Sequence, residues 1–367
     1  MHVIVIGAGI IGAAIAERLA VRGATVTILE KRAPGRGASQ ASAGILAPYT
    51  EAHRSSALLA LGVRSLALYD DFTAGVVERS GCAVEYARTG TFEVALADNR
   101  RDQLQRTAVW LAEENVPHEW LESDAARAFE PAVSLEVTGG LFVAMHGFVN
   151  VRQLVAALLH SARLHGAILE SAVDPTEVDS SDDHVEVASA QRRWTADAVV
   201  VAVGSWMRTL EIRNASAAQV RPVRGQLLHV RWRRGEIPRR VLWGPDCYLV
   251  PSADGSVLIG ATVEDAGFDE STTVAGVHEL MTAAIALAPA VRDASLEGVR
   301  VGLRPRADGL PIVGPLSGSP RVTIATGHYR NGILLAPLTA ELVSGYVLDG
   351  ISDPALATMA PSPGSSF

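Results

Sequence analysis

Two short apolar runs near the N-terminus, residues 2–6 and 25–29, enclose a longer stretch in which apolar residues have helical spacing. A group of glycines separates the first run from that stretch, and an acidic residue follows the second run. Continuous apolar runs of this length are typical of strands that are buried on both faces of a parallel sheet. The pattern therefore predicts a strand, a glycine turn, a helix and a second strand, as at the start of a doubly wound α/β domain.

The rest of the chain changes repeatedly between helical and strand-like patterns, and we find no internal repeat. Helical spacing covers residues 55–80, 101–115, 151–164, 274–288 and a last stretch that ends near 348. Strand-like patterns cover residues 84–98, 139–143, 148–149, 168–169, 185–188, 198–203, 220–262 and 322–325. The apolar run 198–203 suits a buried parallel strand whose end, at Gly204, touches a ligand. Residues 220–262 alternate like antiparallel strands, and the Pro/Ser-rich tail from 354 is predicted to be disordered.

The glycines form a G-x-G-x-x-G motif. Gly7 permits a sharp turn, Gly9 leaves room for a pyrophosphate beside the backbone, and Gly12 lets the helix pack close to the strand. The helix that begins near Ile10 aims its free N–H groups at the phosphates. Glu30 stands where a carboxylate accepts hydrogen bonds from ribose hydroxyls, and it would repel the 2′-phosphate of NADP. The motif predicts dinucleotide binding and does not by itself say which dinucleotide.

Two other interpretations of this segment remain open. Residues 3–16 are apolar enough for a signal peptide or a membrane anchor. However, no Lys or Arg precedes them, Glu17 and Arg18 end the run, and it is shorter than the ~20 residues of a spanning helix. The second interpretation is a strand–helix–strand unit that binds no phosphate.

Composition narrows the choice of partners and compartment. The 367 residues suggest two domains or one large interleaved unit. A net charge of −8 argues against nucleic acid and anionic membranes as partners, and no apolar run is long enough for a membrane span. Cys82 and Cys247 are the only cysteines, which fits a reducing cytoplasm. The ten histidines lack the spacing of metal ligands, so we expect no metal site.

After Glu30 the sequence does not continue with another strand and helix. Residues 31–46 are small and rich in Gly, Ala and Ser, with many free backbone donors. This stretch could be a surface linker. It could equally lie along an extended ligand. FAD needs such a stretch of backbone, whereas a nucleotide domain for NAD would continue here with another strand and helix.

The C-terminal third contains two further motifs, Gly-Leu-Arg-Pro at 302–305 and Gly-His-Tyr-Arg-Asn-Gly at 327–332. With Cys-Tyr-Leu-Val-Pro at 247–251 and Ser-Ala-Gly-Ile-Leu at 42–46, they give the chain its resemblance to a known family. It resembles the D-amino-acid-oxidase-like flavoenzymes, and among them the glycine oxidases. The resemblance covers nearly the whole chain and is weakest over 98–146 and in the tail.

Three residues are expected to act on the substrate. An arginine among apolar neighbours needs an anionic partner, so Arg304 could bind a substrate carboxylate or form a structural ion pair with an acid of the chain. The resemblance implies the first role. It also implies that Tyr248 donates its hydroxyl to that carboxylate and that Arg330 lies between flavin and substrate. As an aromatic residue on a strand, Tyr248 could otherwise belong to the core.

The resemblance implies that FAD is the cofactor and that backbone and small side chains hold it. The implied contacts are Gly7, Gly9, Ile10, Ile11 and Gly12 at the pyrophosphate turn, Glu30 and Lys31 at the ribose, Ser39, Ala43, Gly44 and Ile45 along the phosphates and the ring, Pro175 (or Val173) at the adenine, Gly204, and His328, Arg330, Asn331, Gly332 and Ile333 around the isoalloxazine. A helix starting near Ile333 would point its positive end at the reduced flavin. An ordinary glycine turn is the alternative.

The sequence departs from the family pattern at three positions. Ile45 and Val263 stand where we expect methionine, and Asp246 stands where we expect histidine. The two β-branched residues are predicted to reshape the substrate pocket. No cysteine lies near the C-terminal motifs, so we expect FAD to be bound without a covalent link.

These expectations combine into one architecture, an α/β protein with a Rossmann-like FAD-binding domain interleaved with an α+β substrate domain on an antiparallel sheet. The expected FAD domain comprises residues 1–80, 148–215 and 305–353; the substrate domain comprises 81–147 and 216–304; and 354–367 form a tail.

The expected activity is oxidative deamination of glycine or another small amino acid or amine, with O2 reduced to hydrogen peroxide. A role in thiamine thiazole synthesis is a further expectation. A cytoplasmic homo-oligomer is expected. Three alternatives stay open: a D-amino-acid or proline-type dehydrogenase that reduces a quinone, a non-catalytic flavin-binding subunit, and a tRNA-modifying flavoprotein, which the acidic charge disfavours.

Overall fold

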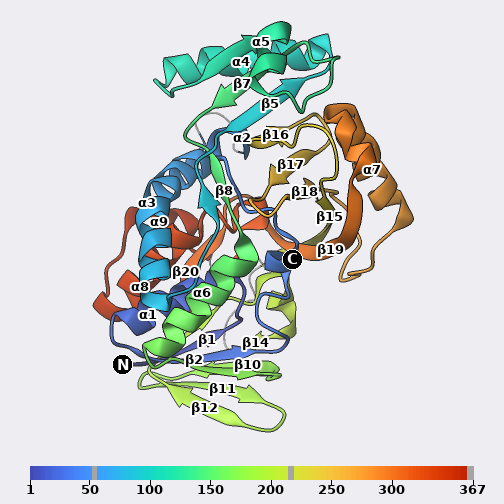
Figure 1. Ribbon diagram of the computed structural model, residues 1–367. Coiled ribbons are helices and arrows are strands. Elements are labelled where there is room, and N and C mark those ends of the chain that lie inside the picture. Colours follow the sequence, from blue (N-terminus) through green and yellow to red (C-terminus); the bar gives the residue numbers. More distant parts are fainter. Residues whose placement is uncertain (52–55, 214–218, 362–367) are drawn as a thin grey trace.

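A six-stranded sheet forms the lower half of the molecule (Figure 1). The computed structural model describes residues 1–51, 56–213 and 219–361. The order of the strands in the sheet is β20 (Ile312–Leu316), β21 (Ser319–Thr326), β13 (Ala198–Val201), β1 (His2–Ile6), β2 (Thr25–Glu30) and β9 (Ile168–Ser171). All neighbours are parallel except β20 and β21. Since β13 pairs directly with β1, it lies inside the sheet, between strands distant in sequence.

Both faces of this sheet are covered, which explains its continuous apolar runs. One face packs against four helices, α1 (Ile10–Val21), α3 (Ala57–Ser80), α6 (Val151–Leu164) and α8 (Ala336–Asp349). The other face packs against a smaller sheet of β12 (Arg193–Ala196), β11 (Val185–Ser189), β10 (Pro175–Ser180) and β14 (Glu211–Ile212).

A second large sheet lies above the first (Figure 1). Its eight strands are β19 (Ser295–Ala307), β15 (Val220–Arg231), β18 (Ser256–Gly260), β17 (Tyr248–Pro251), β16 (Val241–Trp243), β5 (Thr91–Ala95), β7 (Gly139–Val143) and β6 (Glu119–Glu122). Only β16 and β5 are parallel. The helices α4 (Asp98–Glu113), α5 (Ser123–Phe129) and α7 (Val274–Leu287) flank this sheet. The predicted α/β class, with a largely antiparallel second sheet, is confirmed.

Short elements connect the two large sheets. A three-stranded sheet contains β3 (Ile45–Leu46), β8 (Gly147–Val149) and β4 (Tyr86–Ala87). The remaining elements are the helices α2 (Pro48–Glu51) and α9 (Pro354–Met359) and the 3-10 turns η1 (Ala38–Ala41), η2 (Gly204–Thr209), η3 (Pro289–Asp293) and η4 (Tyr329–Asn331). No helix in the described ranges is long and apolar enough to cross a membrane.

The structure corrects the prediction for the tail. Residues 354–359 form α9, whose Leu356 and Met359 are buried against the lower core. Asp353 caps this helix by accepting a hydrogen bond from the Ala355 N–H at 2.8 Å, and proline occupies its first position. Because the tail is rich in Pro and Ser, its sequence pattern does not indicate that Leu356 and Met359 are buried. The predicted disorder of 362–367 lies outside the described residues.

Candidate functional site

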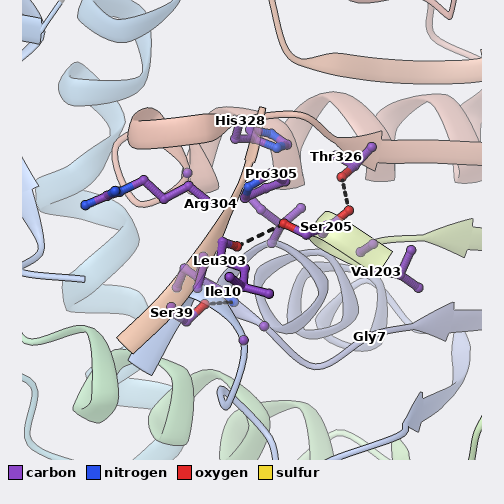
Figure 2. Close-up of a pocket in the computed structure, with 18 of the residues that line it drawn as sticks. Gly7, Ile10, Ser39, Val203, Ser205, Leu303, Arg304, Pro305, Thr326 and His328 are labelled. Atoms are coloured by element: carbon purple, nitrogen blue, oxygen red, sulfur yellow. Dashed lines mark hydrogen bonds between the residues drawn. The ribbon is translucent and has the colours of Figure 1, made fainter. Parts of the chain in front are cut away.

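One long pocket runs between the two large sheets. It begins at the carboxyl ends of β1, β2 and β13 and reaches the face of the eight-stranded sheet at Tyr248 and Arg304 (Figure 2). The carboxyl ends of parallel strands are where open α/β sheets bind their ligands. Glu30 and Pro175 line the pocket toward one end, and Gly332 and Ile333 line it nearer the other. The pocket therefore brings together residues that are more than 300 positions apart in sequence.

The glycine turn at the start of the pocket has the tight geometry predicted for it. Gly7 has φ +104°, and an added Cβ would lie 2.5 Å from the Ala202 carbonyl oxygen. A Cβ on Gly12 would lie 1.9 Å from the Gly7 carbonyl oxygen. Gly7, Gly9, Ile10 and Ile11 line the pocket, whereas Gly12 lies behind it and lets α1 approach β1. Neither close contact leaves room for a side chain.

The acid at the end of β2 and the serine after it hold the turn in place. Glu30 accepts hydrogen bonds from the Ala8 and Arg32 N–H groups, both at 2.7 Å, and it still lines the pocket. The buried Ser39 hydroxyl accepts a hydrogen bond from the Ile10 N–H at 3.0 Å (Figure 2). One of the N–H groups at the start of α1, which the sequence predicts to face the phosphates, is therefore already hydrogen-bonded to Ser39.

Lys31 and the start of β10 form the far side of the pocket at the end where Glu30 lies. Lys31 forms an ion pair with Asp174 at 2.7 Å, and both side chains are about half exposed at the rim. Pro175 lines the pocket, and Val173 is not among the lining residues. The Val173 N–H instead donates to the Glu30 carbonyl. Of the two candidates at this position, only Pro175 faces the pocket.

Small residues line the middle of the pocket, where Ala43, Gly44 and Ile45 lie opposite the turn after β13. Gly44 has φ +76°, and a Cβ there would lie 1.8 Å from the Val149 carbonyl oxygen. The Gly204 carbonyl accepts a hydrogen bond from the Thr326 hydroxyl at 2.9 Å (Figure 2). The second of these contacts attaches the turn after β13 to the end of β21.

Arg304 points into the pocket from β19 (Figure 2). One Nη donates to the Thr262 carbonyl at 2.9 Å and to the Arg224 carbonyl at 3.3 Å. No carboxylate in the described part of the chain forms an ion pair with it, so the alternative of a structural ion pair is wrong. A Cβ on Gly225 would lie 2.2 Å from the guanidinium, so this glycine makes room for the side chain. The other donors of Arg304 remain available to an anion.

Tyr248 is half-buried and lines the pocket, and it also packs against the small core cluster that contains Phe148 and Leu227. It therefore faces the pocket from the edge of the core, and its contact with a carboxylate stays a prediction. Its ring lies 5.3 Å from that of Trp243, centroid to centroid. Burial raises the pKa of the Tyr248 phenol, so its hydroxyl keeps its proton and can act as a donor.

Arg330 has a partner that sequence reasoning missed. Its guanidinium donates to both oxygens of Glu51, at 2.7 and 2.9 Å, and both residues line the pocket. Burial alone would lower the pKa of Arg330, but the charge and hydrogen bonds of Glu51 outweigh it and leave that pKa raised. Arg330 is therefore a fixed cation beside the pocket, whereas Arg304 keeps free donors.

The segment after β21 differs in part from the prediction. His328, Gly332 and Ile333 line the pocket, but Asn331 does not; it borders a separate hollow. The helix begins at Ala336, because residues 329–331 form η4 and a turn follows. The expectation of a helix that starts near Ile333 is thus wrong by about one turn.

The His328 ring lies away from the ligand-facing surface. Its Nε2 is 3.1 Å from the Thr339 hydroxyl of α8, and the residue is buried. Burial lowers the pKa of His328 to about 3. The imidazole is therefore neutral at physiological pH and brings no positive charge to the pocket.

Two more lining residues escaped the sequence analysis. The Arg32 guanidinium lies 4.3 Å from the centre of the Trp206 ring and forms an ion pair with Glu270 at 2.6 Å. Trp206 follows Gly204 by two residues, so its place at the end of a parallel strand was a usable signal. Val263, in contrast, is 54% exposed and is not a lining residue, so it does not reshape the pocket as predicted.

Comparisons with known proteins agree with this geometry. A model of the FAD dependent oxidoreductase family matches residues 2–345. The glycine oxidase of Geobacillus kaustophilus is 33% identical over 94% of this chain and 92% of its own length. The crystal structure of glycine oxidase from that organism has a TM-score of 0.94 at 31% identity and covers 99% of both chains. A bifunctional ThiO/ThiG protein of Nostoc sp. is 34% identical over 97% of this chain, which spans 54% of that relative.

These matches extend over both large sheets and include the glycine turn and the residues around Arg304. They confirm the predicted family and the choice of FAD as cofactor. The chain belongs to the FAD dependent oxidoreductase (DAO) family and is an FAD-dependent amine or amino-acid oxidoreductase.

Proposed function

We propose that this enzyme oxidises glycine or a similarly small amino acid or secondary amine, such as sarcosine or a D-amino acid, to the imine. The observation that carries the proposal is the Arg304 guanidinium, which has no carboxylate partner in the described residues and lines, together with Tyr248, a pocket that begins with a dinucleotide turn. A guanidinium with free donors in a partly apolar pocket is suited to a carboxylate. The relatives named glycine oxidase support the same substrate class.

The residues of the pocket fit FAD. The turn at Gly7 admits no side chain, Gly9 has only the Ser39 hydroxyl near a possible Cβ, and Gly204 has nothing within 4 Å of one. We propose that Gly7, Gly9, Ile10, Ile11 and Gly12 hold the pyrophosphate, Glu30, Lys31 and Pro175 the adenosine, and Ser39, Ala43, Gly44, Ile45, Gly204 and residues 328–333 the rest. For Asn331 and Gly12 the role is indirect, since neither lines the pocket.

This assignment divides the chain as the sequence suggests. We propose that 1–80, 148–215 and 305–353 hold FAD without a covalent link and that 81–147 and 216–304 hold the substrate. Bound FAD supplies the two-electron acceptor that takes hydride from the α-carbon of the substrate.

The residues of the chain position the substrate for this transfer. Arg304 and Tyr248 together hold the carboxylate, which fixes the α-carbon relative to the pocket wall. Glu51 is the acid nearest to this end of the pocket, and it is held by Arg330. We therefore propose that no fixed carboxylate takes the ammonium proton; it passes to solvent, and the neutral nitrogen lone pair assists the loss of hydride. Arg330 keeps the Glu51 carboxylate in place at this wall.

We propose O2 as the final acceptor, with hydrogen peroxide and the imine or its hydrolysis product released. The ThiO/ThiG relatives support a place in thiamine thiazole synthesis. The imine is reactive, so we propose that a following reaction uses it at once. A dehydrogenase that reduces a quinone is the competing proposal.

A peroxide assay on purified protein separates these proposals. We expect peroxide in air from at least one of glycine, sarcosine, D-alanine and D-proline, with glycine or sarcosine preferred. Turnover with an artificial quinone and none with O2 would favour the dehydrogenase. No turnover with either acceptor would favour a non-catalytic flavoprotein.

A further inference from the structure

A second hollow, of about 820 Å³, lies on the other side of residues 32–40 from the main pocket. It is bounded by that segment, by the first half of α6 and by β19. Four arginines line it and one acid does: Arg32, Arg36, Arg152 and Arg300, with Glu270. A hollow of this size can hold an organic molecule.

The charges around this hollow are unbalanced. Arg32 is neutralised by Glu270 at 2.6 Å. Arg36, Arg152 and Arg300 form no ion pair with any carboxylate in the residues that the structure describes. Three guanidinium groups without an ion-pair partner thus line one hollow of a protein whose net charge is −8; Arg36 and Arg152 are exposed and Arg300 is partly buried. Like charges gathered in a recess repel each other unless an anion lies between them.

The strand β19 directs Arg300 into the hollow. In a strand, residues two apart share a face, so Arg300, Gly302 and Arg304 form one row. A Cβ on Gly302 would lie 2.9 Å from the Ala41 side chain, so the η1 turn rests on this glycine. The turn separates the two arginines: Arg304 lines the main pocket and Arg300 lines the hollow.

Arg36 is held in place from the opposite wall. Its Nη1 donates to the Gln40 side-chain oxygen at 3.1 Å, and the Gln40 amide donates to the Val301 carbonyl at 3.1 Å. These hydrogen bonds attach the loop that contains Arg36 to β19, the strand that contains Arg300. Arg36 is therefore held beside the hollow before any ligand arrives, which lowers the cost of binding.

The third wall adds charge. Arg152 is the second residue of α6, whose N-terminus is capped by the Asn150 side chain. The pKa of Arg300 is lowered, first by burial and then by the positive charge of Arg152. The two cations therefore repel each other. Val155 and Leu159, one and two turns further along α6, border the hollow but are themselves buried in the lower core.

We propose that this hollow binds a small molecule that carries a phosphate or diphosphate group. Three guanidinium groups match a multiply charged anion better than a single carboxylate, since each offers a pair of parallel donors. Arg32 and Ser39 line both cavities, so the ligand would also stabilise the loop that supports the FAD turn.

Titration of the FAD-loaded enzyme with inorganic pyrophosphate tests this proposal. Because FAD fills the main pocket, pyrophosphate cannot bind at the dinucleotide turn. By calorimetry at constant ionic strength we expect one site per chain, with a Kd on the order of 10–500 μM. Arg300→Gln is expected to raise this Kd at least about tenfold, a loss of ~1.4 kcal/mol. The matched control Arg292→Gln, at an exposed arginine outside the hollow, should leave it unchanged.

Three results would overturn the proposal. They are no heat of binding at millimolar pyrophosphate, equal binding by wild type and Arg300→Gln, and equal affinity for citrate, which would indicate a site for carboxylates. If Arg300→Gln does not fold, the exposed Arg152→Gln is used in its place. Sedimentation of Arg300→Gln and Arg152→Gln shows whether a second copy of the chain fills the hollow. A shift in oligomeric state on substitution would be a fourth result that contradicts a ligand site.

Discussion

Replacing Arg304 with alanine is expected to raise the KM for glycine or sarcosine at least tenfold while FAD remains bound. The guanidinium lines the pocket without a carboxylate partner in the described residues, whereas Arg330 is paired with Glu51 at 2.7 Å and Lys31 with Asp174. Loss of a charged, bidentate contact costs about 2–4 kcal/mol, so kcat/KM should fall ~30- to ~1000-fold. Steady-state kinetics together with the flavin absorbance of the purified variant measure both effects.

Two matched variants make this prediction specific. Arg304→Lys keeps the charge and loses the fork of donors, so it should lie between the wild type and the alanine variant. Arg221→Ala removes an exposed arginine from the neighbouring strand β15 and should leave KM unchanged. An unchanged KM in Arg304→Ala would remove this residue from carboxylate binding.

Replacing Gly12 with alanine is expected to abolish retention of FAD. The added Cβ would lie 1.9 Å from the Gly7 carbonyl oxygen, so α1 would have to move away from β1. That movement displaces Ile10 and with it the hydrogen bond to Ser39. Overpacking of backbone against backbone costs about 3 kcal/mol, so we expect a lower melting temperature and purified protein without yellow colour.

Gly345→Ala is the matched control for this experiment. Gly345 also lies within a helix, α8, that packs on the same sheet, but nothing lies within 4 Å of its possible Cβ. Alanine there should keep FAD and stabilise the helix slightly. A Gly12→Ala protein that purifies with a full complement of FAD would contradict the close packing described for the turn.

Local patterns predicted the elements whose chemistry is contained in a few adjacent residues. The glycine turn, the buried strand at 198–201 and the motif around Arg304 could all be found this way, because a tight turn or a buried strand restricts residue type directly. The position of α9 could not, since two buried residues, Leu356 and Met359, are too few to form a pattern.

Contacts between distant segments were the part that the sequence could not predict. The pairing of Glu51 with Arg330 joins residues 279 positions apart, and the stacking of Arg32 on Trp206 joins two loops. Neither pair has a spacing that marks it. The same is true of the second hollow, where Arg36, Arg152 and Arg300 come from three separate elements.

Mixing the FAD-loaded enzyme with glycine or sarcosine in the absence of oxygen tests the proposed activity most directly. We predict that the yellow flavin absorbance bleaches as the substrate is oxidised, and that admission of air restores it and releases about one equivalent of hydrogen peroxide. The Arg304→Ala variant should bleach only at much higher substrate concentration. A flavin spectrum that stays unchanged with glycine, sarcosine, D-alanine and D-proline would contradict amine oxidation by this protein.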